Sequence, residues 1–552
     1  MASEPQPLKV LFVSSEVSPF AKTGGLGDVV GALPKALRRR GIDVRVVMPL
    51  YAGMNWHALD RLDGVLGVPM WWGSARAGVR LGRLPGSDVP VYFLEYHRYF
   101  DRPYLYGPPE EGYRDNLERF TFLSRGALEL SRAIQFLPDV IHAHDWQTAL
   151  VPAYVNTVEW GKPLHGAATI YTVHNLAYQG VTDGGAMFIA GLGPEHYHPG
   201  EFEHFGALNL TKGALRHATM LSTVSPTYAR EIQSSEFGCG LDGVLRERRA
   251  DLVGILNGVD VDDWNPATDP HVEANFSAAH PEGKQLCKRT LQLEAGLPAD
   301  PTVPLYGVVG RLTHQKGFDV LAHCMDRLLP WNAHFVLLGN GDRDAEHYFG
   351  TLSARRGGKF KAWLGFDNGL AHRITAGSDF LIMPSRFEPC GLSQMYAMRY
   401  GTLPIVRATG GLVDTVQNYE EAAGAGTGFV FQDLTPDALC NSIGWALSTY
   451  HDRPHHIRAM RDRAMERDFS WDRAAAAYEE MYREAYRRRR GHDFPGRAPE
   501  RPAPAPGALA PAPTPVTPPA PVTPLARVAP ATARKRPAPA ARPRPGSGRS
   551  KK

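Results

Sequence analysis

An apolar run, a glycine-containing loop and a helical pattern follow one another twice in this 552-residue chain, and this repetition constrains the fold most. The first series begins with Lys9–Val13, and apolar residues then recur at helical spacing from Leu26 to Leu37. The second begins at residues 304–309 and continues in a helical pattern over residues 318–329. Two such series predict an α/β fold with two doubly wound parallel sheets. Pro34 lies inside the first helical pattern, where we expect a kink or a restart.

Further apolar runs complete the two series. We expect short buried strands at residues 44–48, 138–141, 335–338, 380–383 and 403–406, and a final amphipathic helix at 471–489. A turn signal at Asn257-Gly258-Val259-Asp260 ends the first series. We therefore divide the chain into a first Rossmann-like domain at 8–258, a second at 259–468 and a C-terminal helix at 469–490.

The last part of the chain, residues 495–552, is a Pro/Ala/Arg tract with almost no large apolar residues. Such a tract cannot bury enough surface to offset its ordering entropy, so we expect a disordered tail. From Gly496 onward it carries eleven Lys and Arg against one Glu, a charge of +10. Since the whole chain has a net charge of +4, the remainder carries −6. A solvated tail is the first interpretation, and contact with a polyanion is the alternative.

Composition excludes several classes of protein. The hydrophobic fraction of 43% is ordinary for a globular protein, and no apolar run is long enough to cross a bilayer. Residues 1–7 lack the features of a secretory signal or a transit peptide. The five cysteines are odd in number and lack C-x-x-C spacing, which argues against disulfides and structural zinc. We expect a cytoplasmic protein with no membrane and no specific nucleic-acid partner.

Three Gly-containing loops stand where a strand is expected to lead into a helix. The first holds Lys22 beside Gly24, Gly25 and Gly27, so that backbone amides and one cation could approach a ligand. The second, at 310–317, holds Arg311 and Lys316, which could converge on a diphosphate, although two solvated surface charges are the alternative. The third, at 385–394, holds Glu388, which could contact sugar hydroxyls or merely complement a helix dipole.

Two histidine-containing segments end further strands. In His142-Ala143-His144-Asp145-Trp146 the i,i+2 spacing without a third ligand is weak support for a metal, and we expect none. His174, in Tyr171-Thr172-Val173-His174-Asn175, is by its chemistry either a structural or a catalytic residue.

Taken together, these loops resemble the bacterial glycogen synthase and plant starch synthase family, whose fold is the two-domain GT-B architecture. The resemblance rests on five ordered blocks over residues 8–489: Lys22-Thr23-Gly24-Gly25-Leu26-Gly27-Asp28, His174 to Gly180, Gly310-Arg311-Leu312, Gln315-Lys316-Gly317 and Glu388-Pro389-Cys390-Gly391-Leu392. It implies a retaining glucosyltransferase that elongates an α-1,4-glucan (glycogen) from ADP-glucose, without a cofactor. The first domain would then be the acceptor side and the second would bind the nucleotide sugar.

The resemblance also implies roles for individual residues. Arg311 and Lys316 would hold the donor diphosphate and Glu388 the glucose, while Asp28, Asp145 and His174 would face the transferred glucose or the acceptor. Tyr96 and Arg119 are weaker acceptor-side candidates. The catalytic set is Lys22, Asp28, Asp145, His174, Arg311, Lys316 and Glu388. The substrate-binding set is Lys22, Gly25, Asn257, Arg311, Lys316, Cys390, Gly391, Leu392, Ser393, Gln394, Thr409, Gly410 and Gly411.

One position departs from the wider retaining GT-B pattern of two glutamates, because Tyr396 stands where the second would be. The resembled family also lacks that acid, so only the ribose contact often assigned to it cannot be carried over. Several alternatives remain: a synthase that uses UDP-glucose, a phosphorylase with a pyridoxal cofactor, a non-catalytic glucan-binding relative, and a polyanion-binding role of the tail.

Overall fold

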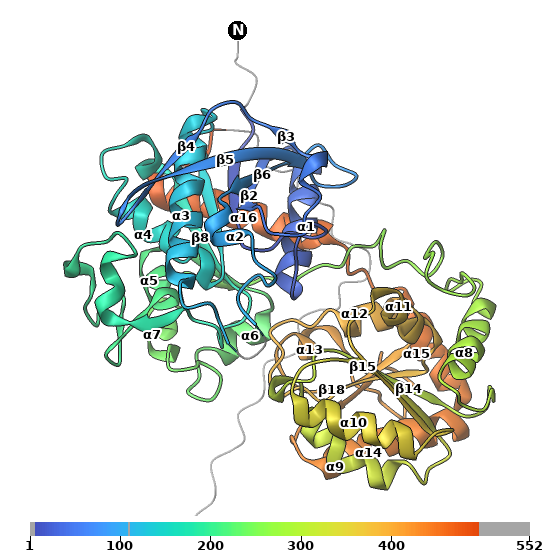
Figure 1. The fold of residues 1–552 in the computed structure, drawn as a ribbon. Coiled ribbons are helices and arrows are strands. Elements are labelled where there is room, and N and C mark those ends of the chain that lie inside the picture. The colour runs from blue at the N-terminus through green and yellow to red at the C-terminus, as the bar shows by residue number, and fades with distance from the viewer. Residues whose placement is uncertain (1–5, 109–110, 496–552) are drawn as a thin grey trace, which may run out of the picture. The chain divides into compact units, whose positions relative to one another are not determined.

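The computed structural model describes residues 6–108 and 111–495, which fall within one compact unit that contains two large sheets and one small sheet (Figure 1). The tract predicted to be disordered lies outside the described residues, apart from Pro495. Among the helices of the described ranges, none is both long and apolar enough to cross a bilayer.

The N-terminal sheet has the strand order β13-β12-β8-β7-β1-β2-β6-β5-β3, with β4 paired to β5. Its strands from β13 to β6 are parallel, whereas β5 runs antiparallel to β6, β3 and β4. The predicted parallel sheet is therefore confirmed for its core strands, and the structure adds an antiparallel edge that the sequence did not indicate. Its strands are β1 (Lys9–Val13), β2 (Asp43–Pro49), β3 (Asp60–Arg61), β4 (Leu66–Met70), β5 (Gly73–Arg83), β6 (Pro90–Glu95), β7 (Val140–His144), β8 (Ala168–Val173), β12 (Met220–Thr223) and β13 (Leu252–Gly254). A small antiparallel sheet holds β9 (Val181–Asp183), β10 (Glu203–His204) and β11 (Ala207–Asn209).

The C-terminal sheet is parallel throughout, as predicted, with the order β16-β15-β14-β17-β18-β19. The four strands expected in this half from the sequence are all present, each within two residues of the predicted bounds. The strands are β14 (Leu305–Val309), β15 (His334–Gly339), β16 (Phe360–Leu364), β17 (Phe380–Met383), β18 (Leu403–Arg407) and β19 (Phe429–Phe431).

Helices cover both faces of the C-terminal sheet: α9, α10 and α14 lie on one side, and α8, α11, α12 and α15 on the other (Figure 1). The helices of the first half of the chain are α1 (Gly25–Arg39), α2 (His97–Phe100), α3 (Asn116–Ala133), α4 (Leu150–Asn156), α5 (Leu210–His217), α6 (Pro226–Glu231) and α7 (Asp242–Glu247). The remaining helices are α8 (Glu282–Glu294), α9 (Phe318–Leu328), α10 (Arg343–Arg355), α11 (Asn368–Gly377), α12 (Ser393–Arg399), α13 (Gly410–Thr415), α14 (Pro436–Asp452), α15 (Pro454–Met465) and α16 (Trp471–Arg490).

Helix α1 runs unbroken through Pro34, so the expected restart is wrong. Proline removes only one backbone hydrogen bond at this position, and ten residues of the helix, Pro34 among them, are buried. Burial of this apolar face is sufficient to keep the helix continuous.

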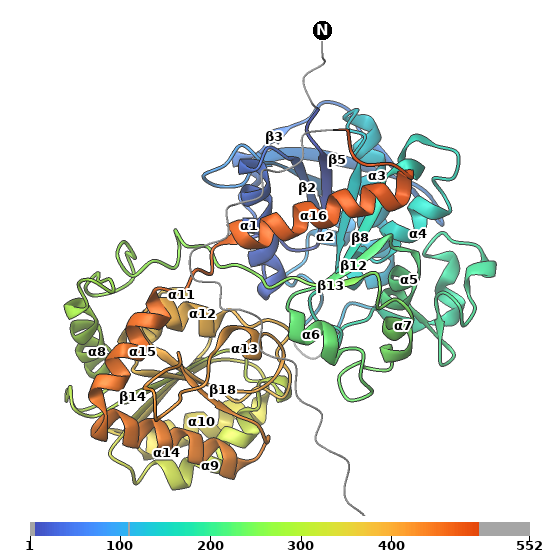
Figure 2. The same cartoon turned by 180° about the vertical axis from the view of Figure 1, so that it is seen from behind.

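The last helix, α16, returns to the N-terminal sheet, where it packs against α1 and β8 (Figure 2). The hydroxyl of Tyr482 lies 2.9 Å from Nδ1 of His142 on β7, and Arg40 forms a 2.8 Å ion pair with the buried Glu479. Helix α16 therefore completes the core of the N-terminal half.

Candidate active site

The strand order of the C-terminal sheet reverses between β14 and β17, so the loops that follow these two strands meet at the carboxyl edge. These two loops contain Lys316 and Glu388, which the sequence predicted to bind the donor. Lys316 Nζ lies 2.5 Å from Glu388 Oε2, and the same oxygen accepts a 3.0 Å hydrogen bond from Ser385 Oγ. Glu388 is buried and Lys316 is partly exposed. The strand order thus brings Lys316 and Glu388, which lie 72 residues apart in the sequence, together as an ion pair.

Arg311 follows β14 in the same loop and is exposed. Its guanidinium makes no hydrogen bond or ion pair with any of the described residues, unlike Arg386 nearby, which forms a bidentate pair with Asp319 at 2.6 Å. A guanidinium that is not engaged within the protein can bind the two oxygens of a phosphate group. The loop therefore offers Arg311 and Lys316 to an anion.

Two glycines allow the loops of this site to approach one another closely. Gly317 has a φ of +70°, and a Cβ there would lie 1.9 Å from the carbonyl oxygen of Pro384. Gly410 has a φ of +46°, and its Cβ would lie 1.9 Å from the carbonyl oxygen of Glu388. Side chains at these positions would displace the backbone that carries Glu388.

The Thr409-Gly410-Gly411 segment makes contacts that the sequence did not indicate. Glu231, at the end of α6, accepts hydrogen bonds from Gly410 N at 2.9 Å and from Thr409 Oγ1 at 3.2 Å. The amide of Gly411 donates to the carbonyl oxygen of Glu388 at 3.0 Å. An anion that bound these amides would have to displace Glu231 from Gly410 N and the Glu388 carbonyl oxygen from Gly411 N, so their contact with substrate remains a prediction.

The segment from Cys390 to Gln394 is turned partly into the protein. Cys390 is buried, and burial raises the pKa of its thiol to about 12. The side-chain Nε2 of the fully buried Gln394 donates to the carbonyl oxygens of Cys390 and Gly391, at 3.1 and 2.9 Å. Gln394 is therefore engaged within the protein, while Gly391, Leu392 and Ser393 are partly exposed.

The first loop of the chain lies at the corresponding reversal of the N-terminal sheet, between β1 and β7. Lys22 Nζ pairs with Asp28 Oδ1 at 2.8 Å, and burial raises the pKa of Asp28 although Lys22 opposes the shift. A Cβ at Gly25 would lie 3.8 Å from Leu392 Cδ1, so this loop reaches the Glu388 segment of the other half.

Glu16 organises this loop and was not identified from the sequence. Its buried carboxylate accepts hydrogen bonds from Thr23 N at 2.6 Å, Thr23 Oγ1 at 2.8 Å, Tyr106 Oη at 2.6 Å and Gly24 N at 3.3 Å. A buried acid must be satisfied by donors. The position of Glu16 just after a buried strand is the signal that could have found it.

Asp145 and His174 come together after β7 and β8. Asp145 Oδ1 accepts from the backbone amides of His174 at 2.7 Å and Asn175 at 3.4 Å. Burial raises the pKa of Asp145 to about 7, against the effect of these bonds, and lowers the pKa of His174 to about 3. The site therefore holds a carboxyl group that titrates near neutrality beside a neutral imidazole.

The two histidines of β7 are engaged within the protein. His142 bonds to Tyr482 Oη and, at 2.6 Å, to Thr172 Oγ1, so both of its ring nitrogens are used. His144 Nδ1 lies 3.0 Å from His174 Nε2. Their surroundings favour a structural role over metal binding.

The other residues singled out in the sequence differ in how far they are buried and in what they contact. Asn257 is buried, and its Oδ1 has no hydrogen-bond partner among the described residues, which leaves one acceptor for a ligand. Tyr96 stacks on Phe122 at 5.0 Å. Arg119 is fully buried and donates to the carbonyl oxygen of Tyr99 at 2.7 Å. The expected contact of Arg119 with the glucan acceptor is therefore replaced by a structural role. Tyr396 stacks on Trp264 at 3.9 Å, in the place where the wider pattern has a second glutamate.

Two Rossmann-like sheets that both carry charged, glycine-rich loops at the carboxyl edge, together with the matches below, place the chain in the GT-B class of glycosyltransferases. Residues 9–247 match the family model of the starch synthase catalytic domain, and residues 292–463 match that of glycosyl transferases group 1. Sucrose-phosphate synthase from Thermosynechococcus elongatus, with 17% identity, a TM-score of 0.56 and coverage of 87% of this chain and 99% of that one, supports the fold alone.

Relatives of higher sequence identity indicate which family of GT-B glycosyltransferases the chain belongs to. Glycogen synthase 1 of Geobacter sulfurreducens is 52% identical over 488 residues, which are 88% of this chain and 97% of the relative. The catalytic domain of starch synthase IV from Arabidopsis thaliana, solved with ADP and acarbose, has 35% identity and a TM-score of 0.82 over 87% of this chain and 99% of that one. The chain belongs to the family of bacterial glycogen synthases and starch synthases, and it is a glycosyltransferase.

Proposed function

We propose that this enzyme transfers glucose from ADP-glucose to the non-reducing end of an α-1,4-glucan, with retention of the anomeric configuration. The observation that carries the proposal is the cluster at the β14–β17 reversal. There Arg311, which has no partner among the described residues, lies in one loop with Lys316, which is paired to Glu388. Two cations and one carboxylate match a donor that has a diphosphate on one side of the scissile bond and a sugar on the other.

The residues divide between the two halves of the chain. Arg311 and Lys316 hold the diphosphate and stabilise the charge that develops on the departing ADP, and Glu388 contacts the glucose. The contact in which Ser225 Oγ donates to the carbonyl oxygen of Pro389, at 2.7 Å, supports a site assembled from both halves. On the N-terminal side, Lys22, Asp28, Asp145 and His174 face the transferred glucose or the acceptor. Residues 8–258 then form the acceptor side and residues 259–468 the donor side.

The reaction proceeds by attack of the acceptor 4-hydroxyl on the same face from which ADP departs. The new C1–O bond forms as the C1–O bond to the diphosphate breaks, and the hydroxyl proton leaves with ADP. Asp145, held by two backbone amides, balances positive charge at the anomeric carbon. Exclusion of water from the site prevents hydrolysis of the donor. No cofactor is required, and the five unpaired cysteines favour a reducing cytoplasm as the location.

A pH profile tests the role of Asp145. Because its folded-state pKa is raised to about 7, the carboxylate forms only as the pH rises through neutrality, whereas His174, with a pKa of about 3, stays neutral. We expect kcat/KM to rise about tenfold per pH unit below pH 7 and to level off above it. The Asp145→Asn variant should have low activity without this rise. A wild-type profile that is flat between pH 5.5 and 7.5 would refute the role.

The donor is tested by glycogen-primed incorporation of glucose from ADP-glucose and UDP-glucose measured side by side. We expect ADP-glucose to be the better donor, and the Lys316→Ala protein to incorporate little from either because it lacks a cation at the diphosphate. Equal or greater use of UDP-glucose would overturn the choice of donor. Glycogen binding without incorporation from either sugar would favour the non-catalytic alternative.

A further inference from the structure

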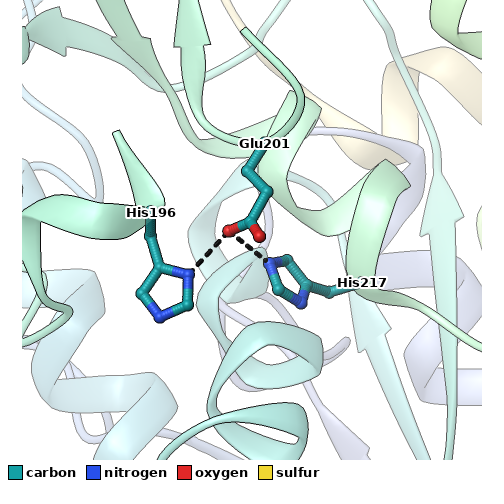
Figure 3. A group of neighbouring side chains, drawn as sticks. All are labelled: His196, Glu201 and His217. Atoms are coloured by element: carbon teal, nitrogen blue, oxygen red, sulfur yellow. Dashed lines mark hydrogen bonds and ion pairs between the residues drawn. The ribbon is translucent and has the colours of Figure 1, made fainter. Parts of the chain in front are cut away.

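A group of two histidines and one glutamate lies in the first half of the chain, in residues to which the transfer reaction assigns no role (Figure 3). His196 ends the short 3-10 helix Pro194–His196, Glu201 follows in the next loop, and His217 is the last residue of α5. Glu201 Oε2 lies 2.7 Å from His196 Nδ1 and 3.1 Å from His217 Nε2. Each side chain is partly buried and retains some solvent access, between 11% and 25%.

The three donor atoms converge on one another as the ligands of a single ion do. One ligand atom from each residue lies within 4.8 Å of the other two. Zinc binds imidazole nitrogen and carboxylate oxygen at about 2.0–2.2 Å, with ligands from two histidines and one carboxylate being a familiar set. At present Glu201 lies at hydrogen-bond distance from both imidazoles. Small rotations of the three side chains would therefore be needed to make room for an ion between them.

The surroundings hold these residues in place. Lys212 Nζ donates to the carbonyl oxygen of Pro199 at 2.7 Å, which fixes the loop to α5, and Asn156 Nδ2 donates to that of His217 at 2.7 Å. The second nitrogen of His196 lies 3.9 Å from Glu195 Oε1. This separation is too long for a hydrogen bond and Glu195 is 71% exposed, so the contacts of the loop and of α5 are what position the two imidazoles.

The local charge is compatible with a cation. Arg248 is the cationic side chain on the His217 side, where it donates to the carbonyl oxygens of Arg216 and Ala218, but its Nε is paired with Asp251 at 2.6 Å. On the other side, His198 Nε2 lies 3.6 Å from Glu201 Oε1 and is half exposed. Its ring or a water molecule could complete a four-coordinate ion.

We propose that His196, Glu201 and His217 bind one divalent transition-metal ion, with Zn²⁺ as the best match to this donor set. The ion clips the loop at residues 194–203 to the end of α5. Helix α5 begins after Asn209, whose Nδ2 donates to Gln179 Oε1 at 2.6 Å in the loop that follows His174. The bound ion would therefore stabilise α5, which contacts the loop that follows His174. The glucosyl transfer itself needs no metal.

The test uses the full-length protein after treatment with a chelator. Zn²⁺ is titrated by calorimetry, and Co²⁺ by visible absorption, because tetrahedral Co²⁺ with nitrogen and oxygen ligands has an intense, characteristic spectrum. We expect one ion per chain and a thermal midpoint that rises by a few degrees with saturating Zn²⁺, as binding to the folded state requires.

The Glu201→Gln variant is the decisive comparison, since a glutamine can still accept hydrogen bonds from both imidazoles but is a poor zinc ligand. We expect it to bind Zn²⁺ at least tenfold more weakly, to lose the Co²⁺ spectrum and to keep the metal-free thermal midpoint near that of the wild type. His280→Ala, which removes an exposed histidine elsewhere, should bind as the wild type does. The proposal is overturned if the wild type shows no saturable binding, or if Glu201→Gln and wild type bind alike, in which case the three residues are only a hydrogen-bonded clasp.

Discussion

Replacement of Arg311 by alanine should lower kcat/KM for ADP-glucose by about two orders of magnitude, or about 3 kcal/mol of transition-state stabilisation. Arg311 and Lys316 lie in the same loop after β14, at the edge where the donor diphosphate is expected, and negative charge grows there as ADP departs. Because the side chain is exposed and makes no hydrogen bond or ion pair within the described residues, its loss should leave the fold unchanged. The measurement is initial-rate kinetics with glycogen as acceptor, together with the thermal midpoint of each protein.

A matched control is Arg356→Ala. Arg356 is also exposed, but it precedes β16 and so lies at the amino end of the sheet, opposite the loops of the site. This variant should keep wild-type kinetics. If Arg311→Ala retains a near-wild-type kcat/KM, or if both variants lose activity equally, Arg311 does not hold the diphosphate.

Replacement of Asp379 by alanine should destabilise the C-terminal sheet by about 3–5 kcal/mol. Asp379 is buried just before β17 and pairs with Lys288 of α8 at 2.7 Å and with Arg461 of α15 at 2.5 Å. It also accepts from the amide of Leu305 at 2.9 Å. Burial acts to raise the pKa of this carboxyl group, but Lys288 and Arg461 outweigh it and lower the pKa. Removal of the carboxylate leaves the ammonium of Lys288 buried without its anion, which is why the loss is large.

Glu294→Ala is the control for this change, since it removes a second acid–base pair from the same helix, α8. Glu294 pairs with Arg373 at 2.8 Å, and both side chains are about one-third exposed, so solvent screens the attraction. Equilibrium unfolding in denaturant should show a large loss of stability for Asp379→Ala and a small one for Glu294→Ala. Equal losses in the two variants would contradict the argument from burial.

The elements that carry the site could be predicted from the sequence because they depend on local patterns. The apolar runs at 304–309 and 380–383 predicted strands, and the glycines after them predicted loops, independently of the rest of the chain. In parallel sheets the carboxyl ends of strands lie at one edge, so Arg311, Lys316 and Glu388 could be identified as candidates. The antiparallel edge formed by β3, β4 and β5 was missed because these strands lie outside the repeated strand–loop–helix series that set the prediction.

Other features depend on partners distant in the chain. Glu231 reaches Gly410 across 179 residues, and Arg119 is buried although an isolated arginine in a sequence is usually expected at the surface. Glu16 could have been noticed after its strand, but Tyr106, which completes its set of donors, lies 90 residues away. No spacing in the sequence encodes such contacts.

By itself, the sequence determined the repeated strand–loop–helix units of the two parallel sheets, the order of the glycine-rich loops and the family that these loops resemble, since all three are properties of short segments. Only the tertiary structure decided that Lys316 pairs with Glu388, that Glu16 and Glu231 hold the loops of both halves, and that His196, Glu201 and His217 converge. The physical reason is that charge pairing, burial and coordination depend on distance in space. Strand order and helix packing set that distance for residues that lie far apart along the chain.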